Sequence, residues 1–404
     1  MYINRIVGDI LLTLVSQYPA LVLTGPRQVG KTTILEHVFP KFAYVSLDYA
    51  QNAEQAETRP QEFLERLGQP LIIDEIQYAP GLLRHIKSSI DAHKNKNGLY
   101  LITGSQSFPL MEAVSESLAG RAVILNMYGI SFSEWNSIGS SAKPIEYLFR
   151  GSFPALWNEP DKPLDRERWY QSYITTYLER DVRSLLNVGR LRDFERFLRA
   201  CAMRSGQTLN MSDLARDVGI APSTAREWIS VLEASHQIVL LEPYHESRGK
   251  RLVKSPKLYF YDTGLALFLS GYSSTAAVLA SPAIGAYWEN HVLSQWLRWK
   301  HWEAPAASLW YWQNQQKLEV DLVVEHNGRL YPIECKYKEI PDSDDCRGIR
   351  AFQKMYPKER LGEASIACLS PNTWEVQSGI AARSGWKPWP DRKSTRLNSS
   401  HRIR

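Results

Sequence analysis

The chain has 404 residues, of which 44% are hydrophobic and 23% are charged, a composition that excludes an intrinsically disordered protein. This length exceeds one ordinary hydrophobic core and predicts about two to four domains. The net charge of +5 does not indicate a nucleic-acid partner, because residues 392–404 hold five Arg or Lys and no acid, which leaves residues 1–391 neutral.

Neither a membrane span nor a disulfide framework is expected. The sequence contains no uninterrupted apolar run of about 18 residues, and MYINRIVGDI at the N-terminus lacks the basic-then-apolar order of a secretion signal. The cysteines are too scattered for a disulfide framework or a zinc ribbon: Cys201, Cys335, Cys346 and Cys368. We therefore expect a cytoplasmic protein with reduced thiols and no membrane partner.

The first predicted unit is a strand at Leu21–Thr24, a glycine-containing loop and an amphipathic helix from Thr32 onward. The loop GPRQVGKT fits the phosphate-binding pattern G-x-x-x-x-G-K-[ST]. Its glycines let backbone amides converge on phosphate oxygens, the catalytic Lys31 neutralises the β- and γ-phosphates, and the Thr32 hydroxyl binds magnesium. An ordinary glycine loop is the alternative. The expected nucleotide contacts are Gly25, Pro26, Arg27, Gln28, Val29, Gly30, Lys31, Thr32 and Thr33.

A second strand, Leu71–Ile73, ends in two acids, Asp74 and Glu75. Acids at the carboxyl end of such a strand face the ligand crevice of an α/β sheet. Asp74 is predicted to hold magnesium through water, and Glu75 to polarise the attacking water. The alternative is a pair of acids that cap a following helix.

Two later segments offer weaker candidates. The strand Leu99–Thr103 precedes Ser105 and Gln106, either of which suits a sensor of the γ-phosphate, although a plain loop is an equal alternative. Arg121 begins another strand and is a candidate phosphate contact, in the same chain or from a neighbouring subunit. An exposed arginine at a strand start is the alternative there.

These motifs resemble an AAA-like ATPase of the additional-strand P-loop class, in a prokaryotic family whose second half is a domain of unknown function. The resemblance rests on the phosphate loop, on LIIDEIQ, LITGSQS and SLAGR followed by SFSEW, and on YLERDV at Tyr177–Val182. It spans nearly all of residues 1–340 and implies ATP as the nucleotide.

The middle of the chain is predicted to be helical. Residues 166–204 place apolar and aromatic side chains at helical spacing, which favours two helices. Arg180 and Arg183 lie close to Glu179 and Asp181, so they either form salt bridges on a solvent face or contact ATP across subunits.

A helix-turn-helix pattern follows, with a helix at Met211–Asp217, a turn at Gly219 and a second helix that starts at Pro222 and is capped by Ser223 or Thr224. Two strands, Ile238–Leu241 and Lys257–Tyr261, then complete a winged helix. DNA contact and packing within the ATPase are both open roles for it. The candidate DNA-contacting side chains are Arg226, Arg248, Lys250, Arg251 and Lys254, whereas Glu227 and Trp228 argue against contact.

Near the C-terminus, EVDLVVEHNGRLYPIECKYK predicts a hairpin that turns at Asn327-Gly328. With that turn at the centre, Asp321 faces Glu334, and Glu319 faces Lys336 on the same side of the sheet. Two carboxylates whose Cβ atoms are about 5 Å apart repel each other unless a cation lies between them. A divalent metal is therefore expected, with Lys336 beside it to stabilise charge on a cleaved phosphodiester.

The hairpin resembles the PD-(D/E)XK nuclease fold, with Asp321 as the first acid and Glu334-Cys335-Lys336 as the second half-motif. The resemblance implies a further metal-binding acid on a preceding helix, which Glu289 matches, and a trailing polar residue, for which Gln353 is the candidate. The alternative is an ordinary polar sheet face, in which Glu319 pairs with Lys336 and Asp321 pairs with a nearby cation.

We predict an α/β protein with a parallel P-loop NTPase sheet in an AAA-like ATPase domain at residues 1–160 and a helical and winged-helix domain at residues 161–272. A restriction-endonuclease-like α/β module follows at residues 273–391. Residues 392–404 have two interpretations, translated adaptor or vector sequence and a disordered basic tail, and are excluded from the fold.

The favoured function is ATP hydrolysis coupled to DNA binding or processing, with ATP and Mg²⁺ as cofactors and double-stranded DNA as the candidate partner. A nucleotide-switched regulatory protein whose nuclease-like module does not cleave is one rival. A scaffold ATPase that touches no nucleic acid is the other. A homo-oligomer is expected if an arginine acts in trans.

Overall fold

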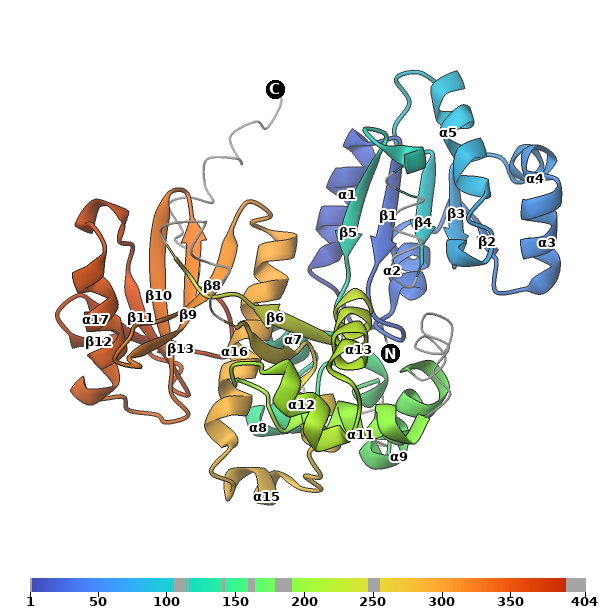
Figure 1. Ribbon diagram of the computed structural model, residues 1–404. Coiled ribbons are helices and arrows are strands. Elements are labelled where there is room, and N and C mark those ends of the chain that lie inside the picture. Colours follow the sequence, from blue (N-terminus) through green and yellow to red (C-terminus); the bar gives the residue numbers. More distant parts are fainter. Residues whose placement is uncertain are drawn as a thin grey trace.

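Three β-sheets organise the residues that the computed structural model describes, namely 2–104, 114, 116–139, 142–158, 164–178, 191–245 and 255–389. Figure 1 shows a five-stranded sheet in blue and cyan on one side of the molecule and a six-stranded sheet in orange and red on the other. Helices coloured green, with a two-stranded sheet, lie between and below them. No helix within the described ranges is both long enough and apolar enough to cross a bilayer.

The N-terminal sheet is parallel throughout and has the order β2-β3-β4-β1-β5. Strand β4 therefore separates β1, which leads into the glycine loop, from β3, which ends in the acids. This arrangement confirms the predicted P-loop sheet with an additional strand. The strands are β1 Ala20–Thr24, β2 Ala43–Ser46, β3 Leu71–Asp74, β4 Tyr100–Thr103 and β5 Ala122–Asn126.

Alternate residues of β1 serve two different cores, because strand side chains point to opposite faces. Leu21 and Leu23 pack in the cluster that contains α1 and α2, whereas Ala20 and Val22 pack in the cluster that contains α4 and α5. Helices thus cover both faces of the sheet, as a parallel sheet requires. The helices are α1 Val7–Gln17, α2 Lys31–Val38, α3 Ala50–Thr58, α4 Pro60–Leu67 and α5 Leu82–Ala92.

The middle of the chain is helical, as predicted. Gly219 ends α12 in a left-handed conformation with φ 81°. The next helix, α13, begins at Pro222 with Ala221 as its N-cap and no side-chain cap, so the predicted cap by Ser223 or Thr224 is wrong. Arg180 and Arg183 lie outside the described residues. The elements here are α7 Phe132–Ser137, α8 Pro144–Arg150, α9 Arg166–Tyr173, a π-helical turn at Ile174–Leu178, α11 Leu191–Ala202, α12 Met211–Val218, α13 Pro222–Ala234, β6 Ile238–Leu241 and β7 Lys257–Phe260.

The C-terminal sheet has the order β12-β13-β11-β10-β9-β8 and mixes parallel and antiparallel pairs. In the β9-β10 hairpin Arg329 faces His326 and Ile333 faces Leu322, which confirms the predicted register around Asn327-Gly328. The elements are α14 Thr263–Leu269, α15 Thr275–Leu279, α16 Ile284–Trp302, β8 Ser308–Gln313, β9 Glu319–His326, β10 Arg329–Cys335, α17 Arg347–Met355, β11 Ala364–Cys368, β12 Trp374–Gln377 and β13 Ile380–Ser384.

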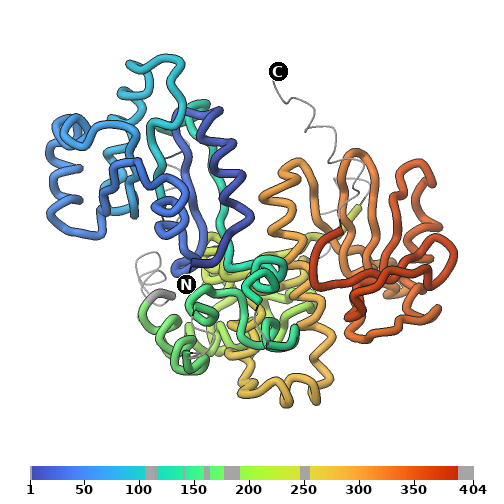
Figure 2. The backbone as a smooth tube through the Cα atoms, turned by 180° about the vertical axis from the view of Figure 1, so that it is seen from behind, coloured from blue at the N-terminus to red at the C-terminus, as the bar shows by residue number. Residues whose placement is uncertain are grey.

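Helix α16 ties the C-terminal sheet to the rest of the molecule. Figure 2 shows it in orange between the N-terminal sheet and the C-terminal sheet. The buried Arg298 guanidinium donates to the Gly129 carbonyl at 3.2 Å and to the Ser152 hydroxyl at 3.0 Å. The Trp302 indole donates to the carbonyl of Asn126, the last residue of β5, at 2.9 Å. One hydrophobic cluster accordingly runs from α1 to α16.

Candidate functional site

Two glycines shape the loop between β1 and α2. Gly25 has φ 137°, and a Cβ at this position would lie 2.0 Å from the Met127 carbonyl oxygen. Gly30 has φ 93° and is the N-cap of α2. Only glycine adopts both conformations without strain. The loop therefore brings its backbone close to β5 and turns directly into the helix, as a phosphate cradle requires.

Lys31 is buried inside this loop, with a relative exposure of 6%. Its ammonium group donates to the carbonyls of Gly25 at 3.0 Å and Pro26 at 2.9 Å. These contacts hold the positive charge within the loop, where the sequence predicted a phosphate-neutralising lysine.

Arg5 anchors the loop from outside, and sequence reasoning missed it. Its guanidinium donates to the Val29 carbonyl at 2.9 Å and to the Tyr128 carbonyl at 2.5 Å. It also forms an ion pair with Glu134 at 3.3 Å, in which both side chains are almost fully buried. Glu134 completes a capping box with Ser131 at the start of α7.

The glycine loop and the acids after β3 meet directly. The Thr32 hydroxyl donates to the Asp74 carboxylate at 2.9 Å. Thr103, at the end of β4, donates to the same carboxylate oxygen and accepts a hydrogen bond from the Glu75 amide at 3.1 Å. Tyr44 donates to the other Asp74 oxygen at 3.1 Å, and burial followed by the Asp74 charge raises the pKa of its phenol. Neither Thr103 nor Tyr44 belonged to the predicted site.

The donor set suits magnesium, because the Thr32 hydroxyl and the Asp74 carboxylate are hard oxygen ligands on adjacent elements. Glu75 follows with φ 59°, and its carboxylate accepts a hydrogen bond from the Gln77 amide. The left-handed backbone at Glu75 therefore ends the extended conformation of β3. The candidate sensors Ser105 and Gln106 lie outside the described residues.

Arg121 does not reach the glycine loop of its own chain, so the expectation of a contact in cis is wrong. It precedes β5, whose Ala122 faces Ala20 and whose Asn126 faces Thr24. Arg121 is therefore roughly 16 Å from that end of the sheet, at about 3.3 Å per residue. Its guanidinium binds Asp91 through two hydrogen bonds, of 2.7 and 3.1 Å. A contact with a neighbouring subunit stays a prediction.

The turn after α13 packs behind the glycine loop. His236 and Gln237 line a small cavity together with Pro26 and Val29. The His236 ring makes edge contacts with Tyr128 and Tyr261, at centroid distances of 5.6 and 5.5 Å. Burial, followed by the charges of His301 and Lys31, lowers the pKa of His236 to about 3. The middle of the chain thus contacts the candidate nucleotide site.

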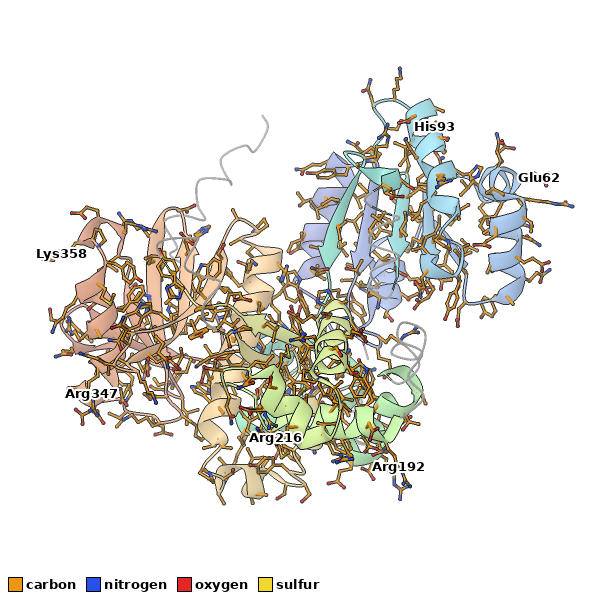
Figure 3. All side chains as sticks on the ribbon, in the orientation of Figure 1. Glu62, His93, Arg192, Arg216, Arg347 and Lys358 are labelled. Carbon is orange, nitrogen blue, oxygen red and sulfur yellow. The ribbon has the colours of Figure 1, made fainter. Side chains whose placement is uncertain are left out.

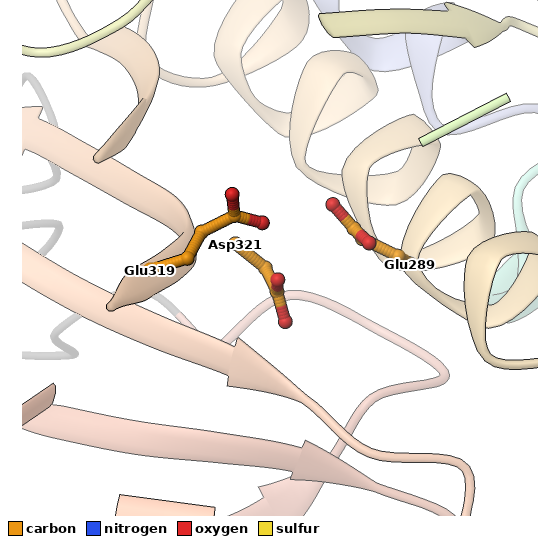
Figure 4. A group of neighbouring side chains, drawn as sticks. All are labelled: Glu289, Glu319 and Asp321. Carbon is orange, nitrogen blue, oxygen red and sulfur yellow. The ribbon is translucent and has the colours of Figure 1, made fainter. Parts of the chain in front are cut away.

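A second candidate site lies where α16 faces β9. Figure 4 shows the carboxylates of Glu289, Glu319 and Asp321 converging from the helix and the strand. One oxygen from each lies within 4.8 Å of the others, which is close enough to share a metal ion. Glu319 belongs to this group in place of Glu334, which the sequence predicted as a ligand. The trailing Gln353 accepts from Arg350 at 3.3 Å.

Glu334 and Lys336 form their own pair at 2.8 Å. Lys336 therefore pairs with Glu334 and not with Glu319, the partner that the alternative interpretation gave it. The second Glu334 oxygen is buried and has no hydrogen-bond partner among the described residues. Burial, followed by the Asp321 charge, raises the pKa of Glu334 well above its usual range, and Lys336 opposes the shift.

Strand β7 brings two further side chains into the carboxylate group. The Lys257 ammonium lies 2.9 Å from Glu289 and also pairs with Glu319. The Tyr259 hydroxyl donates to the same Glu289 oxygen. Burial, followed by the Asp321 charge, raises the pKa of Glu289 to about 7 against the opposing effect of Lys257. The position of Lys257 was not foreseen from the sequence.

Three family models match successive parts of the chain. The model described as an AAA domain matches residues 17–136. A domain of unknown function, DUF8612, matches residues 142–276, and another, DUF4143, matches residues 284–382. The first match covers the parallel sheet and the glycine loop, and the third covers the carboxylate group.

The uncharacterized protein Rv2008c of Mycobacterium tuberculosis is 36% identical over 329 residues, which are 80% of this chain and 71% of that protein. The uncharacterized protein Mb2031c of Mycobacterium bovis matches to the same extent. Among solved structures, the Walker-type ATPase PABY2304 of Pyrococcus abyssi is 16% identical, with a TM-score of 0.45 over 66% of this chain and 96% of that one. AMPPCP-bound DnaA from Aquifex aeolicus is 15% identical, with a TM-score of 0.28 over 56% and 86%. These TM-scores are too low for either structure to inform the fold or the function. By its domain matches and its mycobacterial relatives, the chain belongs to the family of P-loop ATPases that join an AAA domain to the C-terminal domain of unknown function DUF4143.

Proposed function

We propose that this protein binds ATP with Mg²⁺ in the glycine loop and hydrolyses it. The observation that carries the proposal is the 2.9 Å hydrogen bond from the Thr32 hydroxyl to the Asp74 carboxylate. This contact joins the loop after β1 to the acids after β3, and it assembles the oxygen ligands that Mg²⁺ prefers. Membership of the AAA family supports ATP as the nucleotide.

Each residue has a distinct task in this proposal. The backbone amides of the loop and the Lys31 ammonium bind the phosphates, so Lys31 exchanges its two carbonyl contacts for phosphate oxygens. Thr32 and Asp74 hold Mg²⁺, which supplies charge neutralisation on the phosphates when bound. Glu75 accepts a proton from the attacking water or orients it, with Gln77 fixing its carboxylate.

The test compares Lys31→Ala and Glu75→Gln with the unchanged protein in a phosphate-release assay. Lys31→Ala should abolish binding of ATP. Glu75→Gln should retain binding and lose roughly 100-fold in kcat, as expected for loss of a general base. The exposed Lys41→Ala is the matched control and should behave like the unchanged protein. Undiminished turnover in both site variants would overturn the proposal.

We propose as a second function that the C-terminal module is a PD-(D/E)XK-type module that binds a divalent metal and cleaves phosphodiesters. The supporting observation is the convergence of Glu289, Glu319 and Asp321 within 4.8 Å. Lys336 directly follows the neighbouring strand β10, pairs with Glu334 and stabilises negative charge on the phosphate. The Asp321 carboxylate also accepts a hydrogen bond from the Cys335 amide at 2.8 Å, and this bond fixes the register of the two half-motifs.

Plasmid cleavage with Mg²⁺ or Mn²⁺ tests this second function. Asp321→Ala and Lys336→Ala should each preserve intact plasmid, whereas the exposed Lys358→Ala control should not. Equal loss of plasmid in all these proteins would rule out cleavage at this site and favour a regulatory role.

We propose that α11, α12, α13, β6 and β7 form a winged helix whose main role is packing. Its turn at His236 and Gln237 lies against the glycine loop, and its strand β7 enters the carboxylate group. The outer face of α12 mixes charges, since Arg216, at the surface in Figure 3, pairs with Asp213 at 2.8 Å. The exposed Arg226 is a candidate phosphate contact, whereas Arg248, Lys250, Arg251 and Lys254 lie outside the described residues.

A mobility-shift titration against salt separates the two roles of the winged helix. Phosphate contacts give affinities that fall steeply with salt. Absence of any shift of double-stranded DNA at low salt is the result expected for a packing module. A shift that Arg226→Ala weakens would instead assign DNA contact to α13.

A further inference from the structure

We infer that the ammonium group of Lys257 is a built-in competitor of the divalent cation, so that metal binds the Glu289, Glu319 and Asp321 carboxylates only when Lys257 withdraws. This inference rests on the second proposed function, the metal-binding C-terminal module. It adds a regulatory residue on strand β7, outside both half-motifs.

The first support is the position of the ammonium group. Lys257 Nζ lies 2.9 Å from Glu289 Oε1 and pairs with Glu319 Oε1. These two carboxylates, with Asp321, are the group whose oxygens gather within 4.8 Å. A metal ion bound by these acids would therefore occupy part of the space that the ammonium group fills. The ammonium supplies the positive charge that close carboxylates need.

The second support is burial. The Lys257 side chain is 4% exposed and Glu289 is 14% exposed. A lysine is rarely buried to this extent unless it is paired, because desolvation of a lone ammonium is costly. Strand β7 holds it in place: Lys257 faces Leu241 on β6, and the Tyr311 ring lies 5.6 Å from the ammonium.

The third support is the remaining excess of acid. Two lysines, Lys257 and Lys336, face the carboxylates of Glu289, Glu319, Asp321 and Glu334. The second oxygen of Glu334, a residue only 9% exposed, has no hydrogen-bond partner among the described residues. The group is therefore built for more positive charge than Lys257 and Lys336 supply, as a divalent ion replacing one ammonium would provide.

Donors from three elements bind the three carboxylates in addition to Lys257. Tyr259 on β7 donates to Glu289, and Gln313 on β8 donates to Glu319 at 3.0 Å. The Cys335 amide on β10 donates to Asp321. These donors already hold the carboxylates in place, so the acids keep their arrangement when the lysine is removed.

The experiment measures Mn²⁺ affinity of the full chain by electron paramagnetic resonance without nucleotide. Every protein carries Asp74→Asn, which removes the acid of the magnesium site in the ATPase part. Adding Lys257→Gln should raise the Mn²⁺ affinity at least about tenfold, and adding Asp321→Asn as well should cancel the gain. Lys338→Gln is the matched control, because Lys338 also bridges two acids, Asp342 at 2.9 Å and Asp345 at 2.5 Å.

The possible failures are distinguishable. Equal Mn²⁺ affinity with and without Lys257→Gln, lost in both cases with Asp321→Asn, overturns the competition and leaves the metal site intact. Absence of Mn²⁺ binding in every variant overturns both the metal site and the competition, and it does not bear on the separate proposal of ATP hydrolysis at the glycine loop. If Lys257→Gln fails to fold, Lys257→Gln with Glu319→Gln removes one acid together with the lysine. This double variant should then bind Mn²⁺ more tightly than Glu319→Gln alone. Equal Mn²⁺ affinities of the double variant and Glu319→Gln overturn the inference.

Discussion

The hydroxyl of Thr103 donates a hydrogen bond to the carboxylate of Asp74, across the boundary between β4 and β3. The hydroxyl oxygen of Thr103 also accepts a hydrogen bond from the Glu75 amide at 3.1 Å. Thr103 is fully buried, so it holds both acids without touching solvent. The additional strand of the sheet therefore orients the two acids proposed for magnesium and water.

Thr103→Val should lower kcat roughly tenfold and raise the Mg²⁺ concentration needed for half-maximal rate. The substitution removes two hydrogen bonds, each contributing about 0.5–1.5 kcal/mol. A positioning role predicts a small effect on KM and rescue by Thr103→Ser. The exposed Thr58→Val serves as the control. An unchanged kcat in Thr103→Val would contradict the role.

Arg5→Met should destabilise the fold by about 3–5 kcal/mol, because it leaves Glu134 buried without its ion-pair partner. It should also weaken ATP binding in the folded fraction, since Arg5 holds the Val29 carbonyl of the glycine loop. Urea unfolding and calorimetric ATP titration measure the two effects. Arg59→Met removes an exposed pair with Glu62 and should change stability by less than about 1 kcal/mol.

Gly25→Ala should prevent nucleotide binding. The new Cβ would meet the Met127 carbonyl oxygen at 2.0 Å, and φ 137° is strained for any L-residue. Either the loop or β5 must move, so both ATP affinity and melting temperature should fall. Gly81→Ala, where no atom lies within 4 Å of the new Cβ, is the matched control. Wild-type affinity in Gly25→Ala would contradict the proposed cradle.

The stability of the protein should fall in mild acid, partly through His291. Burial, followed by the Arg298 charge, lowers the pKa of His291 from 6.5 to about 3. Because the folded pKa is depressed, this contribution is complete above pH 6.5 and is lost as the pH falls toward 3.

Between pH 7 and pH 5, the free energy of unfolding of His291→Phe should therefore fall by about 2 kcal/mol less than that of the unchanged protein. Urea unfolding at the two pH values measures this difference. The exposed His85→Phe should follow the unchanged protein. Parallel losses in His291→Phe and the unchanged protein would show that His291 does not contribute.

The sequence predicted those features whose residues are close together along the chain. The phosphate loop occupies consecutive positions, and its glycine requirement follows from backbone geometry at Gly25 and Gly30. The β9-β10 register follows from a two-residue turn, which fixes every facing pair once Asn327-Gly328 is identified. The roles of the individual side chains at these positions stay predictions until they are measured.

Other features depended on which distant segments pack together. Arg5 contacts Tyr128, 123 positions away, and Lys257 contacts Glu319, 62 positions away. A lysine on a strand is as consistent with solvent as with burial until its neighbours are known. A phosphate contact and an exposed strand start were both open for Arg121 for the same reason. The chain by itself thus determined the local phosphate loop, the acids at strand ends and the hairpin. Only the tertiary structure decided strand order, the anchors of the loop and the cation held by the carboxylates, because these contacts arise from packing between elements and leave no periodic pattern in the sequence.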